Sequence, residues 1–364
     1  MKTHFFNTVI LLLAITFLQA QQIITVSNDV NFVENPPYSF NNLQTALDYA
    51  AAHPGPDYTI LVCGTPTPYG GVTITSPVTL YGAGYHPDSQ FGYPTSINSI
   101  GLYGGSGTTI MGFLVNTIYV GEYTDGINDI KIKRNRITGS ITRGGIFGGG
   151  AHFNWLVANN IINTISAKGN LFNTLITNNI ISNQISGYYA GSSVIIANNI
   201  FLEYTGSVFS EVHSAIIQNN IFFGVSPLGA YNSAFAANLC TCQYNIDFGI
   251  GIQPYMNTED PDFENVLGEE PNDIFVDAGN NPPGPYDYAY DYHLDPNSGG
   301  IGAGTNGSDV GIYGDFHLFP IGGVSPYITS APPPVPQITL MNILTPNVAP
   351  GGKIKVHIKA RAQE

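Results

Sequence analysis

The middle of the chain repeats one short phrase six times: IKRNRI (132–137), VANNII (157–162), TNNIIS (177–182), ANNIFL (197–202), QNNIFF (218–223) and QYNIDF (243–248). The phrases share one asparagine, which is Asn135, Asn160, Asn179, Asn199, Asn220 and Asn245 in turn. Successive asparagines are 25, 19, 20, 21 and 25 residues apart. A period near 20, with short β-branched runs between Gly, Asn and Ser turns, is typical of parallel β-helix coils and is too short for repeats built of helical pairs.

Alignment on the shared asparagine predicts the core of each coil. The residues three before it are Ile132, Val157, Ile176, Ile196, Ile217 and Cys242, and those five before it are Ile130, Trp155, Thr174, Val194, Ala215 and Cys240. Since side chains alternate between the two faces of a strand, both sets point inward. The two cysteines are therefore interpreted as buried apolar residues. The asparagines themselves predict a ladder, in which side-chain amides hydrogen-bond to neighbouring coils.

The residues four before the asparagine are expected to face outward, yet four of the six are aliphatic. They are Leu156, Leu175, Ile195 and Ile216, between Lys131 and Thr241. We call these four aliphatic residues the outer apolar column. Extended apolar surface on a soluble protein needs a cover or marks a contact site. Either a loop or the C-terminal tail packs on the column, or the column lines a groove for a partner or ligand.

The segments around the repeat complete the fold class. Residues 41–51 carry apolar residues at 43, 46, 47 and 50 behind a capping Asn, which predicts an amphipathic helix that seals the first coil. The chain resembles the right-handed parallel β-helix proteins of the pectin-lyase-like superfamily, of the exported bacterial type. The resemblance is carried by this helix and by the segments ILVCGTPTPYGGVTI (60–74), PVTLYGAG (77–84) and DYHLDPNSGGIGAGTNGSDVGIYG (291–314). The resemblance covers about residues 40–320 and implies an architecture rather than one activity.

We therefore predict an all-β protein: a right-handed parallel β-helix, or solenoid, with an N-terminal capping helix and a C-terminal β-strand pair. Residues 1–20 have the apolar run and small final residue of a signal peptide. Residues 21–320 form the β-helix with its cap, 321–336 a Pro-rich linker and 337–364 a C-terminal hairpin and tail. The chain is expected to be secreted or on the cell surface, with the periplasm as an alternative. No later segment reaches the length of a transmembrane helix.

The C-terminal tail alternates apolar and basic residues in KIKVHIKAR (353–361). Such alternation predicts an amphipathic strand, which we expect to pair with residues 337–345. This hairpin either docks on the β-helix or caps its end. A signal for secretion or surface attachment is the alternative.

The formal net charge of −14 excludes the usual basic class of nucleic-acid-binding proteins. A local basic cluster nevertheless raises a catalytic hypothesis, with the candidates Lys131, Lys133, Arg136, Arg143 and Lys168. A polysaccharide lyase needs a base to remove the proton beside a uronate carboxylate and a cation to neutralise that carboxylate. The motifs of polygalacturonases, pectate lyases and alginate-lyase-like β-helices are absent from the sequence. The same cations also fit a solvated surface paired with nearby acids.

Two further groups of side chains lie near the C-terminal end of the predicted β-helix. Tyr286, Tyr288, Tyr290 and Tyr292 are candidates to stack on sugar rings or to pack over the coils. Asp287, Asp291, Asp295 and Asp309 are weak candidates for Ca²⁺, since no EF-hand or calcium β-roll spacing is present. No other metal or cofactor is predicted.

Three functions remain open. The leading hypothesis is an exported non-catalytic surface or matrix protein, whose rod binds polysaccharides or neighbouring surface proteins. The alternatives are a lyase of uronate-containing polysaccharides and a structural module of an exported assembly. A lyase requires the cations to converge with carboxylates, a glycan-binding rod requires exposed aromatic residues aligned on one face, and an assembly module requires an uncovered outer apolar column.

Overall fold

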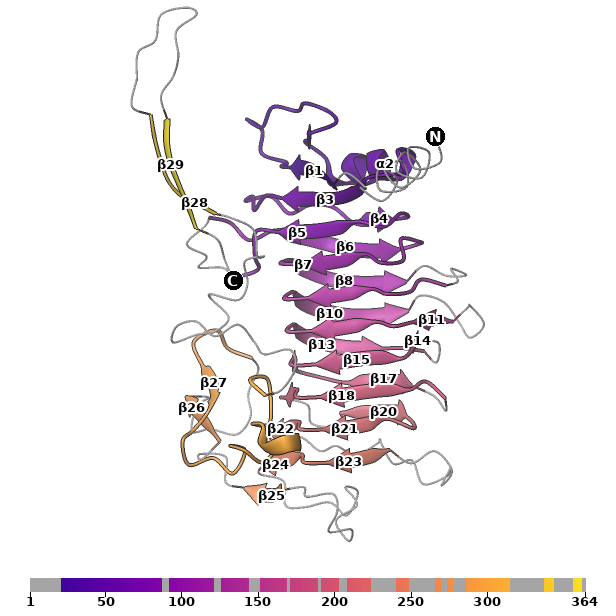
Figure 1. Ribbon diagram of the computed structural model, residues 1–364, viewed down its shortest axis with the longest axis vertical. Coiled ribbons are helices and arrows are strands. Elements are labelled where there is room, and N and C mark those ends of the chain that lie inside the picture. The colour runs from indigo at the N-terminus through magenta and orange to yellow at the C-terminus, as the bar shows by residue number, and fades with distance from the viewer. Residues whose placement is uncertain are drawn as a thin grey trace, which may run out of the picture.

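The computed structural model is a parallel β-helix whose coils stack along one axis (Figure 1). It describes residues 21–86, 92–120, 126–143, 151–168, 171–188, 191–202, 208–223, 240–248, 266–269, 274–277, 286–314, 337–343 and 356–361. The proposed signal peptide and Pro-rich linker lie outside these residues. The predicted fold class is confirmed.

Two long parallel sheets run the length of the stack. Sheet A contains, in spatial order, β2 (Ser39–Phe40), β1 (Gln21–Val26), β3 (Asp57–Val62), β5 (Thr79–Gly82), β7 (Thr109–Met111), β9 (Lys131–Lys133), β12 (Leu156–Ala158), β15 (Thr174–Thr177), β18 (Val194–Ala197), β21 (Ile216–Gln218) and β23 (Thr241–Gln243). Sheet B contains β4 (Val72–Ile74), β6 (Ser96–Leu102), β8 (Leu114–Val120), β10 (Arg136–Arg143), β13 (Ile161–Ser166), β16 (Ile180–Ile181), β19 (Ile200–Phe201), β22 (Ile221–Phe223), β24 (Ile246–Phe248) and β25 (Val266–Glu269). β17 (Ile185–Tyr188) and β20 (Phe209–Val212) extend sheet B, and β11 (His152–Phe153) pairs with β14 (Leu171–Phe172).

The corner between the sheets explains why asparagine occurs in pairs. The residue before each shared asparagine has a positive φ, between 52° and 58°, in Arg134, Asn159, Asn178, Asn198, Asn219 and Tyr244. This left-handed conformation is strained for most side chains and is best tolerated by Asn among non-glycine residues. The first asparagine of the pair therefore turns the chain, and the second begins the next strand with its side chain inward.

The second asparagines form a continuous buried ladder. All six are fully buried. In Asn199, Oδ1 accepts hydrogen bonds from the backbone N–H and the Nδ2 of Asn179, at 3.0 Å each. Its Nδ2 donates to the carbonyls of Ile176 and Ala197 and to Oδ1 of Asn220. Each amide therefore satisfies its own corner and binds the coils on both sides, which fixes their register.

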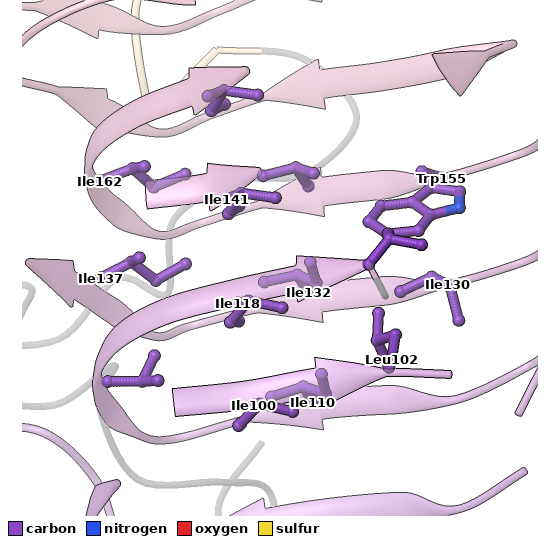
Figure 2. Packing of buried hydrophobic residues seen from close by; sticks show 14 of the residues in the cluster. Ile100, Leu102, Ile110, Ile118, Ile130, Ile132, Ile137, Ile141, Trp155 and Ile162 are labelled. Carbon is purple, nitrogen blue, oxygen red and sulfur yellow. The ribbon is translucent and has the colours of Figure 1, made fainter. Parts of the chain in front are cut away.

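Stacked apolar side chains fill the space between the two sheets. Figure 2 shows isoleucines of successive coils packed above one another, with Ile110 and Ile132 facing Ile100 and Ile118. Trp155 occupies the corner beside Ile130, where its Nε1 donates to a backbone carbonyl at 2.9 Å. Both predicted inward columns are buried, including Cys240 and Cys242, which are not paired in a disulfide. The cysteines are packing residues, as predicted.

The N-terminal end is closed by helix α2 (Leu43–Ala52). Asn42 is its N-cap, and the Asn42 side chain accepts a hydrogen bond from the backbone N–H of Thr45 at 3.1 Å. The buried face consists of the four apolar residues that the sequence pattern indicates, at 43, 46, 47 and 50. The helix lies against the first coil in Figure 1 and extends the same core.

A second apolar layer lies outside sheet B, where the sequence indicated none. The residues one after the ladder asparagines form a column in register, Ile161, Ile180, Ile200, Ile221 and Ile246, and each is at most 4% exposed. Residues of the segments 274–277 and 286–314 cover this column. The C-terminal part of the β-helix region therefore packs on sheet B, not on the outer apolar column of sheet A.

The corner asparagines hold this covering segment in place. Nδ2 of Asn178 donates to the carbonyls of Ile312 and Gly314 at 2.9 and 2.8 Å, and Oδ1 of Asn219 accepts from the backbone N–H of Thr305 at 3.0 Å. Gly311, with φ +78°, approaches so closely that a Cβ would lie 2.6 Å from Cδ1 of Ile221. The covering segment also contains β26 (Phe275–Asp277) paired antiparallel with β27 (Asp291–Leu294), and the 3₁₀ turn η4 (Thr305–Gly307).

The C-terminal strands β28 (Gln337–Ile343) and β29 (Val356–Arg361) form the predicted antiparallel pair. The pair stands outside the stack of coils in Figure 1. Residues 356–359 are all exposed. That the hairpin docks on the β-helix or caps its end stays a prediction.

Replacing a ladder asparagine tests its contribution to stability. Asn199→Leu leaves the Asn179 backbone N–H and two buried carbonyls without their side-chain partner, so we expect the free energy of unfolding to fall by about 3 kcal/mol or more. Urea denaturation followed by circular dichroism measures the change. Asn173→Gly is the matched control, because Asn173 is an exposed corner residue with φ 49° that glycine also adopts. An equal loss in both variants would contradict a special role for the ladder.

Candidate binding surface

The outer apolar column lies on the outward face of sheet A, as predicted. Strand pairing places Leu156 beside Leu175, Leu175 beside Ile195 and Ile195 beside Ile216. Leu156 and Leu175 are half-buried, whereas Ile195 and Ile216 are 38% and 40% exposed. Lys131 and Thr241 occupy the same column at its two ends. The column is thus an aliphatic ridge four coils long.

The residues two positions further along these strands keep the ridge prominent. Ala158, Thr177 and Ala197 are small and buried, and Gln218 follows them in register. From β12 to β18 this neighbouring column holds only small side chains, and the Gln218 that follows in β21 is uncharged. The surface beside the ridge is therefore flat and uncharged, which suits contact with another apolar surface.

An aromatic pair lies beside the first half of the ridge. Phe153 in β11 and Phe172 in β14 each precede a ridge leucine by three residues, and their rings stack with centroids 5.2 Å apart. Phe153 is 39% exposed. Between the pair and the ridge, Nδ2 of the corner residue Asn154 donates to Oδ1 of Asp129 at 3.1 Å. This pair was not predicted from the sequence; the signal was an Asn, Asp or Ser six residues before five of the six ladder asparagines.

The candidate catalytic cations point to different sides of the coils. Lys131 and Lys133 lie on the outward side of sheet A, where Lys131 is exposed and Lys133 half-buried. Burial lowers the pKa of Lys133, and the charges of Arg134 and Lys131 lower it further. Lys168 is an exposed corner residue with φ 46° after β13. Lys131 and Lys133 therefore share the outward side of sheet A, whereas Lys168 lies at a corner that follows a strand of sheet B.

The two arginine candidates belong to packed surroundings. The guanidinium of Arg136 lies over the rings of Tyr286 and Tyr288, with 5.1 and 4.7 Å to the centroids. Arg143 is only 2% exposed at the end of β10, and its Nε and Nη1 have no hydrogen-bond partner among the described residues. Neither arginine presents a free guanidinium on the surface that the lysines share. The basic residues, adjacent in sequence, are dispersed in space.

The tyrosine run is part of the layer that covers sheet B. Tyr286 and Tyr292 are 8% and 2% exposed and stack on each other at 5.6 Å. Tyr288 and Tyr290 are half-buried at the same layer. Burial raises the pKa of Tyr288, while the Arg136 charge opposes that shift. The hypothesis that the run stacks on sugar rings is therefore wrong for Tyr286 and Tyr292, which pack over the coils.

The acidic candidates for Ca²⁺ are engaged in local turns. Oδ1 of Asp287, Asp295 and Asp309 accepts a backbone N–H from Ala289, Asn297 and Gly302, respectively, at 2.8–2.9 Å. Asp291 pairs with His293 at 2.6 Å, and the His293 ring stacks on Tyr313. Within the described part of the chain, no three His, Cys, Asp or Glu side chains are grouped to hold a metal ion. Calcium binding by these aspartates stays a prediction.

No protein-family model, curated protein or solved structure matches this chain. The parallel β-helix therefore comes from the structure, and the pectin-lyase-like assignment stays an expectation from the sequence. Among the described residues, no helix has the length and apolar character needed to cross a membrane.

The packing role assigned to Arg136 is testable. Arg136→Met removes the cation–π contacts with Tyr286 and Tyr288, each worth about 0.5–2 kcal/mol in proteins. We expect faster amide exchange in residues 286–294 than in the unmodified protein, measured by hydrogen–deuterium exchange and mass spectrometry. Lys131→Met is the control, because Lys131 is an exposed neighbour on the other sheet and its loss should leave this segment unchanged. Unchanged exchange in Arg136→Met would contradict the packing role.

Proposed function

We propose that this chain is an exported, non-catalytic rod that binds neighbouring proteins through the outward face of sheet A, as a module of a surface or matrix assembly. The observation that carries the proposal is the uncovered half of the outer apolar column, where Ile195 and Ile216 are 38% and 40% exposed in adjacent coils. Apolar side chains that are exposed side by side in this way mark contact sites on soluble proteins. Export rests on the signal peptide predicted in residues 1–20, and membership of the pectin-lyase-like superfamily on the sequence resemblance.

The arrangement of the two sheets supports the choice of face. Both sheets carry an aliphatic column on their outward side, but the described residues cover only the column of sheet B. A rod that needed no partner would gain stability from polar residues on the outward side of sheet A. The ridge, the flat strip of small residues and the Phe153–Phe172 pair instead make a surface with the apolar and aromatic character of interface cores.

Dispersal of the cations disfavours the lyase alternative. Proton abstraction beside a uronate carboxylate requires a base and a neutralising cation on the same side of the substrate. Arg136 is stacked on tyrosines and Arg143 is buried, which leaves Lys131 and Lys133 on the outward side of sheet A. Two lysines on a flat surface, with no other catalytic group beside them, are better suited to attracting anions in general than to catalysing proton abstraction.

An absorbance assay decides between binding and catalysis. The purified chain is incubated with alginate, pectate and glycosaminoglycans, with and without Ca²⁺, and absorbance is followed at the unsaturated-uronate band. We expect no rise with any substrate. A rise that Lys131→Ala abolishes would establish a lyase and contradict the proposal. Lys168→Ala is the matched control, since Lys168 is an exposed lysine in a corner away from sheet A.

Site-specific photo-crosslinking tests the binding face. A benzophenone amino acid replaces Ile195 or Ile216 in cells that make the protein from its own gene, and adducts are identified by mass spectrometry. We expect discrete protein adducts from both positions. The control is the same probe at Thr109, which lies in the same column two strands before Leu156 and is flanked by polar residues. Equal adducts from all three positions, or none, would contradict a specific contact through the ridge.

A further inference from the structure

One column of the β-helix interior contains an arginine. The column consists of Leu102 in β6, Val120 in β8, Arg143 in β10 and Ala167, which lies one residue beyond the pairing of β10 with β13. All four residues are at most 2% exposed. Figure 2 shows Leu102 pointing into the space between the two sheets, on the same side of the interior as Trp155. Arg143 therefore places its side chain in the core of the rod.

The buried guanidinium has no counter-ion among the described residues. Nε and Nη1 of Arg143 are buried without a hydrogen-bond partner there, and no described acid forms an ion pair with this residue. An uncompensated charge in a protein interior is strongly destabilising, and arginine does not escape this penalty by losing its proton. The column is therefore stable only with an anion beside Arg143.

The wall that follows β10 brings a histidine to the same corner of the interior. His152 in β11 is fully buried and pairs with Leu171 in β14. In the coil of β13 and β14, Ala167 and Leu171 lie beside Arg143 and His152 and are only four residues apart. Arg143 and His152 therefore enter the interior from the two sides of one corner.

Hydrogen bonds to Ile127 hold the His152 ring beside Trp155 and fix its charge. The backbone N–H of Ile127 donates to Nδ1 of His152 at 3.2 Å, and the Ile127 carbonyl accepts from Nε1 of Trp155 at 2.9 Å. The centroids of the two rings are 6.5 Å apart. Because Nδ1 accepts a hydrogen bond, the imidazole is the neutral tautomer with its proton on Nε2. Among the described residues, this corner thus contains one buried positive charge, that of Arg143.

The charge and the apolar surroundings favour a small monovalent anion. One guanidinium balances one negative charge, whereas a phosphate group brings a charge of about −1.5 to −2 into the core. Lys168, next to Ala167, is exposed and keeps its charge in water. Val120 and Ala167 present only alkyl groups on the two sides of Arg143, so hydrogen-bond donors reach a ligand there from few directions. A halide ion suits such a place, because it has no second polar atom that needs a partner.

We propose that Arg143 binds a chloride ion in the interior of the β-helix, at the corner between β10 and β11. The ion neutralises the guanidinium and is a structural ligand of the coils around it. The inference goes beyond the proposed function and does not depend on it, since it concerns the interior of the rod and not the outward face of sheet A.

Thermal unfolding of the full chain in sodium chloride tests the site. Ionic strength is kept constant with sodium gluconate, whose anion is too large for the core. Chloride that binds only the folded chain raises the melting temperature, by about 2 °C for each tenfold increase above the dissociation constant. Arg143→Met removes this dependence, whereas Lys168→Met retains it, because Lys168 is exposed. A melting temperature that does not change with chloride in the unmodified protein, or that changes equally in Arg143→Met, overturns the inference.

Diffraction from crystals of the unmodified protein locates the ion even if Arg143→Met does not fold. Bromide replaces chloride in the crystallisation solution, and its anomalous scattering marks its position. A bromide peak in contact with Nε or Nη1 of Arg143 supports the inference. Peaks only at the surface mean an adventitious ion only, and they overturn the inference, as does the absence of any peak. A carboxylate of the chain that contacts Arg143, with no bromide there, overturns it as well.

Discussion

The buried side-chain amide of the second asparagine in each corner is the interaction on which the structure depends. An amide buried without partners would cost several kcal/mol, so the ladder is stable only when the coils are stacked in register. In that register each Oδ1 and Nδ2 is satisfied by the corner of a neighbouring coil, from Asn135 to Asn245. Burial of apolar side chains in the interior stabilises the stack of coils, and the ladder fixes the register between neighbouring coils.

The register of the coils also determines which side chains line up on the outside of the rod. Once the ladder is aligned, the residues before and after it are aligned too, and aliphatic side chains at two outward positions become two continuous columns. The column on sheet B is covered by residues of 274–314, and the corner residues Asn178 and Asn219 supply hydrogen bonds to that cover. The column on sheet A has no such cover among the described residues. The difference between the two faces is the physical basis for assigning contacts to sheet A.

The sequence predicts the fold well because period, turn residues and inward columns all recur in each coil. It predicts the candidate site less well, because contacts between residues far apart in the sequence decide which outward column the C-terminal segment covers. Arg136 and Tyr288 are far apart in the chain, and nothing in either local pattern indicates that the guanidinium lies over the ring. An aliphatic residue follows five of the six ladder asparagines, as regularly as the outer apolar column recurs, yet only three-dimensional packing decides which column the C-terminal segment covers. The outward position of Leu156, in contrast, followed from strand alternation alone.

The most direct test of the ladder is the exchange rate of its side-chain amides. Asparagine side chains are labelled with nitrogen-15, the protein is transferred to deuterated water, and the Nδ2 protons are followed by NMR. We expect a set of asparagine amides that persists for hours and belongs to Asn135, Asn160, Asn179, Asn199, Asn220 and Asn245, while exposed residues such as Asn173 exchange at once. Loss of the ladder signals within minutes would contradict a buried, hydrogen-bonded ladder and with it the register of both outer columns.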